Sequence, residues 1–163
     1  MNTKDLIKQS LQMSAFVING YMEDISEEEL FMRPAENANH VAWQIGHLIS
    51  AEHSFMKEVM PEKVSALPAN FTEKHAKEMC SENSSDKFCS KAEYMELLAK
   101  TRSETLACLE AIDESRFDED APESIRAFCP TVGDTFMLCA SHYLMHSGQI
   151  AVLRRKLDKP IVI

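Results

Sequence analysis

The stretch from Thr131 to Leu157 constrains the fold more than any other part of the chain. It contains no proline, and its apolar residues recur at steps of three and four, which places them on one face of an α-helix. These residues are Val132, Phe136, Cys139, Tyr143, Ile150, Leu153 and Leu157. Thr131 followed by Asp134 is typical of a capping box, and the cations at 154–156 suit the negative end of a helix. We therefore predict a long amphipathic helix over this stretch.

This predicted helix carries two histidines, His142 and His146. Residues four apart are offset by roughly 40° on an α-helix, so both imidazoles leave the same face one turn apart. Two imidazoles in that relation can chelate one transition-metal ion. Helical His-x-x-x-His pairs also occur without a metal, so the pair indicates a site only together with a further ligand.

Composition favours a helical, intracellular protein. The chain has 163 residues, enough for one domain with a substantial core, and we expect a single domain over residues 1–163. It has only four glycines, and its net charge of −9 argues against nucleic acid or an anionic membrane as the main partner. No apolar run is long enough to span a bilayer, and the first residues lack a signal peptide's apolar centre. We expect a cytoplasmic protein whose five cysteines are reduced.

Three further long helices follow from the same periodicity. We predict them over residues 3–23, 39–59 and 90–112, the second capped by Asn39 and stopped by Pro61. Ser90 and Glu93 form a capping box for the third. Residues 61–89 and 113–130 are irregular, although residues 71–79 could form a short helix. The prediction is an all-α fold, a four-helix bundle with long connections after the second and third long helices, which need not be antiparallel neighbours.

His47 lies in the middle of the second predicted helix. On a helical wheel His40 lies about 20° and Gln44 about 60° from it, whereas Glu52 is more than about 100° away. If this helix packs beside the last one, His47 can converge with the His142–His146 pair on one ion. Three protein ligands leave an open coordination position, as in catalytic sites, and imidazoles suit zinc, nickel, copper or iron. The alternative for His47 alone is a hydrogen-bonded core histidine, but burying three unpaired histidines would be unfavourable.

Several polar residues share the sectors of these histidines. Gln44, Gln149 and His40 could orient a bound cofactor, a substrate or a water molecule, or could be plain packing and surface residues. No carboxylate shares these sectors, so no general base is evident and the catalytic residues stay unassigned. Cys139 is interpreted as a small buried hydrophobe and Trp43 as a core or dimer-interface residue.

Two segments resemble a known family. They are Val41–Leu48 and His142–Ile150, and with Lys159-Pro160 they are similar to the DinB-like superfamily, also called DinB/YfiT-like metalloenzymes. The resemblance implies a four-helix bundle, commonly a homodimer, in which His47, His142 and His146 bind a divalent ion. Many members have an arginine where this chain has Ser147. The expected ion is zinc or nickel, with iron as a further candidate.

Some members of that superfamily use low-molecular-weight thiols in S-transfer or isomerisation. A metal held by three neutral imidazoles keeps its positive charge and lowers the pKa of a bound thiol or water. The functional hypothesis is a metal-dependent S-transferase or hydrolase acting on a small-molecule electrophile. The alternative is a non-catalytic metal- or ligand-binding helical-bundle dimer with a structural or vestigial site. A fourth protein ligand, such as His40 or Cys139, would favour that alternative.

Overall fold

The computed structural model describes residues 1–161 and 163. Every named element in this part of the chain is helical, and an isolated bridge between Asp120 and Thr131 is its only β pairing. The predicted all-α fold is confirmed. The α-helices are α1 (Thr3–Met22), α2 (Val41–Val59), α3 (Phe71–Lys74), α4 (Lys91–Ala111) and α5 (Val132–Lys156). Five short 3-10 turns lie between them, at Glu29–Phe31, Pro61–Lys63, Lys77–Met79, Ser85–Lys87 and Glu114–Asp118.

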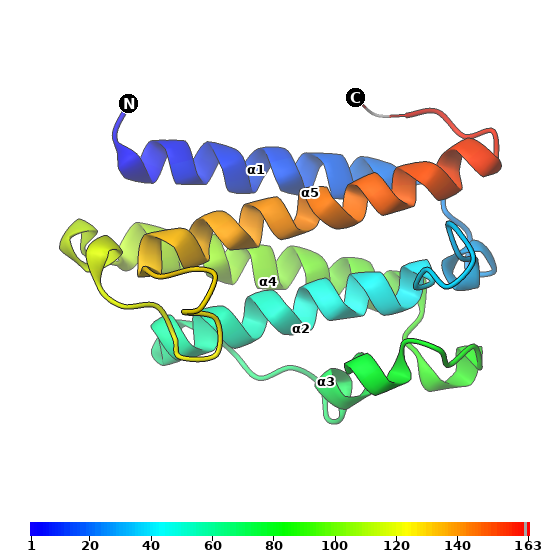
Figure 1. Ribbon diagram of the computed structural model, residues 1–163, viewed down its shortest axis with the longest axis horizontal. Helices are drawn as coiled ribbons and strands as arrows, with labels where there is room; N and C mark the ends of the chain where they lie inside the picture. The colour runs from blue at the N-terminus through cyan, green and yellow to red at the C-terminus, as the bar shows by residue number, and fades with distance from the viewer. Residues whose placement is uncertain (162) are drawn as a thin grey trace.

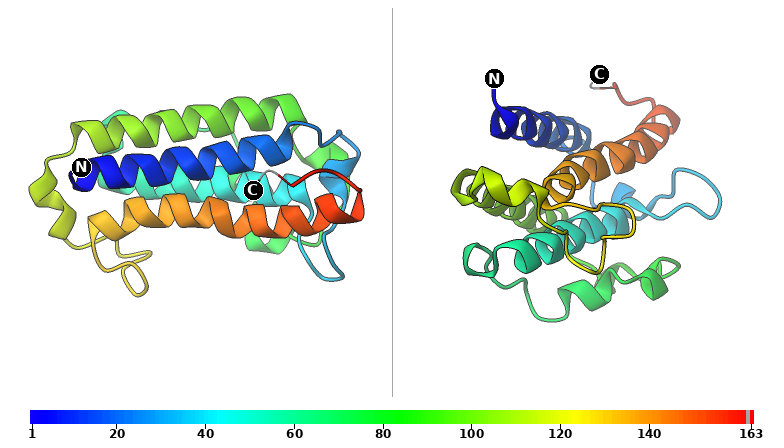
Figure 2. Two further views of the ribbon diagram at one scale, coloured as in Figure 1. Left: turned by 90° about the horizontal axis from the view of Figure 1, so that it is seen from above. Right: turned by 60° about the vertical axis from the view of Figure 1, so that its left-hand side comes forward.

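The four long helices pack side by side (Figure 1). Helix α1 packs against α5 and α4, and α2 packs against α4 and α5, so α1 lies diagonally opposite α2 and α4 lies diagonally opposite α5. The ribbon runs in one direction along α1 and α5 and in the other along α2 and α4 (Figure 1). Helices α2 and α4 are thus parallel neighbours, and residues 60–90 return the chain to its starting end (Figures 1 and 2). This connection is long because it must run back along the length of α2 before α4 can begin beside the start of α2.

Local hydrogen bonds explain where the long helices begin. The capping boxes at Ser90 and Thr131 are present as predicted, and Asn2 forms another before α1. The prediction of Asn39 as the cap of α2 is wrong. His40 takes that position, and its Nδ1 accepts the Trp43 backbone N–H at 3.0 Å. An imidazole nitrogen supplies the acceptor that a helix start requires, although histidine is not a usual capping residue.

The connection after α2 folds back over that helix through close contacts. The ring of His75 lies so near Gly46 that a Cβ there would meet its Cδ2 at 2.0 Å. Nδ1 of His75 donates to the Phe71 carbonyl at 2.7 Å, and Nε2 accepts from the Tyr94 hydroxyl at 2.7 Å. The indole Nε1 of Trp43 donates to the Ala76 carbonyl at 3.0 Å. The first half of α2 is therefore held from outside by a segment about thirty residues further along the chain.

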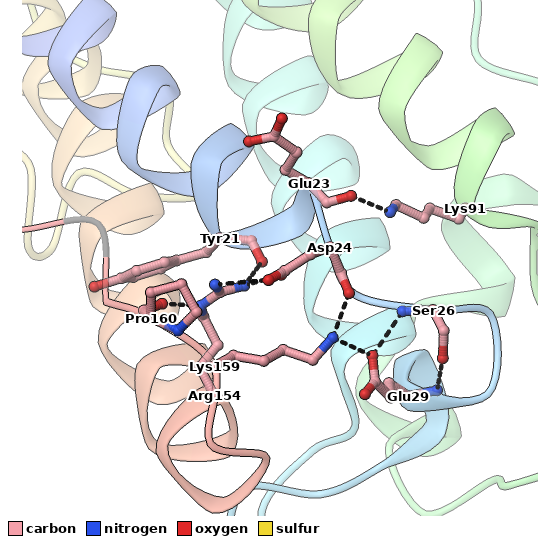
Figure 3. A network of polar contacts seen from close by, with 9 residues as sticks. All are labelled: Tyr21, Glu23, Asp24, Ser26, Glu29, Lys91, Arg154, Lys159 and Pro160. Carbon is pink, nitrogen blue, oxygen red and sulfur yellow. Dashed lines mark hydrogen bonds and ion pairs between the residues drawn. The ribbon is translucent and has the colours of Figure 1, made fainter.

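The end of the chain is fastened to the end of α1 by charged groups (Figure 3). Arg154 is 2% exposed and donates from Nη1 to the Tyr21 carbonyl at 2.7 Å and from Nε to the Pro160 carbonyl at 2.8 Å. It also forms an ion pair with Asp24, and this hydrogen-bonded pairing lowers the pKa of the Asp24 carboxyl. Lys159 adds an ion pair with Glu29 at 2.9 Å. These contacts fix the α1–α5 pair at the end where α2 begins.

Within the described residues, none of the helices has the length and apolar character needed to cross a membrane.

Candidate metal centre

The side chains of His47, His142 and His146 converge where α2 packs against α5. The ring centroids of His142 and His146 lie 4.9 Å apart, as one helical turn dictates. The His47 ring lies 5.0 Å from that of His142 and 5.5 Å from that of His146. Each residue offers one ring nitrogen, and these three atoms lie within 4.8 Å of one another. The side-by-side packing of the two helices thus brings the three imidazoles to one point.

A chain of hydrogen bonds sets the orientation of His146. The Gln44 amide nitrogen donates to the Asn39 carbonyl at 2.7 Å, so the Gln44 carbonyl oxygen points the other way. That oxygen lies 2.9 Å from Nδ1 of His146 and can only accept, so Nδ1 carries the proton. The lone pair of the neutral ring is then on Nε2. This is the usual arrangement of a metal-ligating histidine, whose second nitrogen donates to a neighbouring group.

The orientation of His47 is set by stacking. The Trp43 indole lies parallel to the His47 imidazole, with an interplanar angle of 7° and centroids 4.8 Å apart. Trp43 is itself fixed by its hydrogen bond to the Ala76 carbonyl. Since Trp43 and His47 are four residues apart on α2, helix geometry places the two rings side by side. The prediction that Trp43 packs in the core or at an interface is refined, because the 6% exposed indole supports a site residue.

Burial keeps the three imidazoles neutral. It lowers the pKa of His47 below its ordinary value. Burial, with the neighbouring His47 ring, lowers the pKa of His142 to about 4. Burial, with both neighbouring rings, lowers the pKa of His146 to about 3. At neutral pH all three rings are uncharged, which is the form that can donate a lone pair to a metal.

The donor set fits a transition-metal ion. Three neutral imidazoles are the ligands of several catalytic zinc sites, and borderline ions such as zinc and nickel favour them. No fourth His, Cys, Asp or Glu joins the cluster among the residues that the structure describes. His47 and His142 are half-buried, so the cluster is accessible from solvent on one side. A fully enclosed structural site would have a fourth protein ligand instead.

The other residues that the sequence analysis named as neighbours of the three histidines have different roles in the structure. Both ring nitrogens of His40 are used elsewhere, since Nδ1 caps α2 and Nε2 lies 2.9 Å from the Glu82 carbonyl. Cys139 is 1% exposed in the core, and its carbonyl accepts a hydrogen bond from Arg102 at 3.0 Å. Gln149 is exposed and has no side-chain hydrogen bond within the described residues. Of these residues and Gln44, only Gln44 has a hydrogen bond to one of the three histidines among the described residues.

Sequence reasoning missed the supporting residues from distant segments. The roles of Ala76 and His75 in holding α2 follow from the return path of the 60–90 connection, and no local pattern indicates them. One signal was available, because a glycine inside a helix destabilises it and so suggests a close approach. Gly46, next to His47, is such a glycine.

Comparison with known proteins adds one finding. Residues 16–150 match the protein-family model described as the DinB superfamily, and this span includes all three clustered histidines. A search of curated proteins finds no match.

Proposed function

Since the chain belongs to the DinB superfamily and its fold clusters three imidazoles, we propose that it is a metal-dependent enzyme. His47, His142 and His146 would hold one divalent transition-metal ion, zinc or nickel in the first place and iron as a further candidate. The observation that carries the proposal is the convergence of three neutral ring nitrogens within 4.8 Å with no fourth protein ligand among the described residues.

The proposed reaction is attack by a thiol or by water on a small electrophile. A divalent ion held only by neutral ligands supplies a positive charge that favours the anionic form of the nucleophile. The chain's own contribution is to hold the ligands. Gln44 keeps the proton of His146 on Nδ1, and stacking against Trp43 fixes the orientation of the His47 ring. The half-buried faces of His47 and His142 leave a side from which a small molecule can approach.

The proposal also covers the fold around the site, the oligomeric state and the cosubstrate. The four long helices would form the four-helix bundle typical of the superfamily, with residues 1–163 as one domain and two copies as a homodimer. A low-molecular-weight thiol would be the cosubstrate of an S-transferase, and water would replace it in a hydrolase. Gln44 supports this assignment by its contact with His146, whereas Gln149 would serve only if a ligand reached its exposed side chain.

Elemental analysis of the purified protein tests the metal site. The wild-type chain should retain about one ion per chain, and His47→Ala, His142→Ala and His146→Ala should each lose it. His53→Ala is the matched control, because His53 also lies on α2 but binds the Ser65 carbonyl at 2.9 Å. Stoichiometric metal in all three cluster variants would contradict the assignment of these histidines as metal ligands.

Turnover separates the enzyme from the non-catalytic alternative. The metal-loaded protein should consume model electrophiles with at least one common thiol, or with water alone, and His142→Ala should not. Dependence on thiol identifies a transferase, and activity without thiol identifies a hydrolase. A protein that binds metal and gains stability from it, yet converts none of these substrates, would have a structural or vestigial site instead.

A further inference from the structure

An apolar face runs along the outer side of α1 and α5, which pack side by side (Figure 2). Six large apolar side chains on this side of the two helices are each between 43% and 60% exposed. They are Leu6, Met13 and Phe16 of α1 and Met137, Leu144 and Val152 of α5. Each set of three falls within about 80° on its helical wheel. Val17 and Ala151 lie next to the two sets and are buried in one core cluster, so the sets border the α1–α5 contact and form one continuous face.

Charged residues are missing from the same stretches of the two helices. They make up 26% of the chain, yet none occurs in residues 9–22 of α1 or in residues 135–153 of α5. A helix on the surface of a monomer normally turns charged and polar residues to solvent. Here the exposed side is mainly apolar, with neutral polar residues such as Gln9 and Ser141. Depletion of charge around exposed apolar residues is typical of the core of a protein–protein interface.

The dimensions of the face suit a stable dimer. Helix α1 has 20 residues, so it is about 30 Å long, and two helices side by side are about 20 Å wide. The largest apolar patch on a typical monomer covers roughly 300–600 Å², and a standard interface buries about 800 Å² on each partner. The corrugated accessible surface of a face with these dimensions is therefore large enough for a stable interface.

One end of the face is hollow and the other end projects. A hollow of about 490 Å³ lies between Phe16 of α1 and the segment that includes Arg154 and Pro160, which lie beside the end of α1 (Figure 3). At the opposite end, where α1 and α5 both begin, Leu6 and Met137 are exposed. A two-fold axis that sets the helices of two copies antiparallel brings the projecting end of each copy to the hollow of the other. The face is thus complementary to itself, as an isologous interface requires.

We propose that two copies of the chain dimerise through this α1–α5 face. Each α1 packs antiparallel on α1 of the second copy, and each α5 packs antiparallel on α5 of the second copy. Met13 and Leu144, near the middle of their helices, lie at the two-fold axis. The inference rests on the homodimer proposed above, to which it assigns an interface, and it does not depend on the metal site.

Sedimentation equilibrium of the full chain over a range of concentrations tests the interface. The wild-type chain should have twice its monomer mass of 18.5 kDa. Met13→Glu should raise the dimer dissociation constant at least about 100-fold, because it buries a carboxylate opposite its own copy. Phe128→Glu is the matched control and should leave the constant unchanged, because Phe128 is 64% exposed but lies before α5 and off the face.

A mixture of two variants tests the antiparallel arrangement. Met13→Glu and Met13→Lys should each be monomeric alone, and an equal mixture should regain the dimer mass, because residue 13 meets its own counterpart across the axis. A mixture that stays monomeric would overturn this arrangement. A dimer that persists in Met13→Glu would overturn the choice of face. A wild-type chain that is monomeric up to about 100 μM would overturn the proposal as a whole and leave the face to a different protein.

The interface and the metal site can fail independently. Monomeric Met13→Glu should still retain about one ion per chain, because Met13 lies on α1 and the three histidines lie on α2 and α5. A wild-type chain that binds metal as a monomer would contradict the interface alone. A dimer that Met13→Glu dissociates, but that holds no metal, would contradict the metal site alone.

Discussion

Five of the buried and half-buried histidines fall into two groups that differ in the hydrogen bonding of their ring nitrogens. His40 and His75 are at most 2% exposed, and in each ring both nitrogens are engaged by hydrogen-bonding partners. In the cluster, Nδ1 of His146 is the one ring nitrogen with such a partner among the described residues, and one nitrogen of each ring lies within 4.8 Å of the other two. Burial lowers the pKa in both groups, to about 4 for His75 as for His142. A low pKa therefore does not distinguish the two groups, whereas the hydrogen bonding of their ring nitrogens does.

The largest expected effect separates the two groups by metal binding. Zinc at about a thousand times its dissociation constant should raise the free energy of unfolding of the wild-type chain by about 4 kcal/mol. His142→Ala should abolish this gain because the cluster loses a ligand. His75→Phe should lower the starting stability but keep the gain. Urea unfolding with and without zinc measures both, and loss of the gain in His75→Phe would break the distinction between the two groups.

The next effect is the pH dependence of the hydrogen-bonded group. Above pH 6.5 His75 is neutral in the folded and unfolded chains and contributes no pH dependence. Below pH 6.5 His75 becomes protonated in the unfolded chain. In the folded chain it stays neutral down to its lowered pKa of about 4. Stability should therefore fall as pH falls from 6.5 to 4, by about 3 kcal/mol from His75.

The His75→Phe variant separates this contribution from that of the cluster, because the three clustered imidazoles are the same in both chains. In unfolding curves at pH 7 and pH 4.5 without added metal, the wild-type chain should lose more stability than His75→Phe, and the difference is the His75 contribution. An equal pH slope in His75→Phe and the wild-type chain would contradict this assignment.

A third effect concerns the glycine beneath His75. Gly46→Ala places a Cβ at 2.0 Å from the His75 ring, so the ring and its segment must move. We expect a loss of about 3 kcal/mol, at the upper end for overpacking. Gly148→Ala is the matched control, because it lies in α5 with nothing within 4 Å of the added Cβ. It should stabilise the helix by about 0.5–1 kcal/mol, and a similar change in both variants would contradict the close contact.

The smallest effect tests the one hydrogen bond made by the cluster. Gln44→Leu removes the acceptor for Nδ1 of His146 and should weaken metal binding by about 10–100-fold. Gln149→Leu should leave the affinity unchanged, because Gln149 is exposed and has no side-chain hydrogen bond to the three histidines among the described residues. Competition with a chromophoric chelator measures both affinities. Unchanged binding in Gln44→Leu would show that His146 needs no such partner.

Local sequence signals predicted the elements well and the contacts between them only in part. Capping boxes at Ser90 and Thr131 could be found because their partners lie three residues apart. The His142–His146 geometry follows in the same way from one helical turn. The approach of His47 needed an assumption that two distant helices pack together, which the family resemblance made specific. The shared face of Gln44 and His47 was visible on the helical wheel, but the partner of Gln44 was not.

The contacts that could not be predicted depend on how the helices are aligned along one another, which no local sequence pattern encodes. Glu52 was placed off the His47 sector, but its pairing with Arg102 of α4 at 3.1 Å could not be anticipated. His40 looked like a neighbour of His47, yet its position at the first turn gave it a capping role. His75 lies in a segment with weak periodicity, and its contact with Gly46 arises from the path of the whole connection.

The stacking of Trp43 on His47 has a practical consequence. Trp43 is the chain's single tryptophan, and its indole lies parallel to one of the three clustered imidazoles. Its fluorescence is therefore a built-in optical reporter. A cation arriving at His47 would alter the quenching of the indole, so emission from unlabelled protein can follow occupancy in real time.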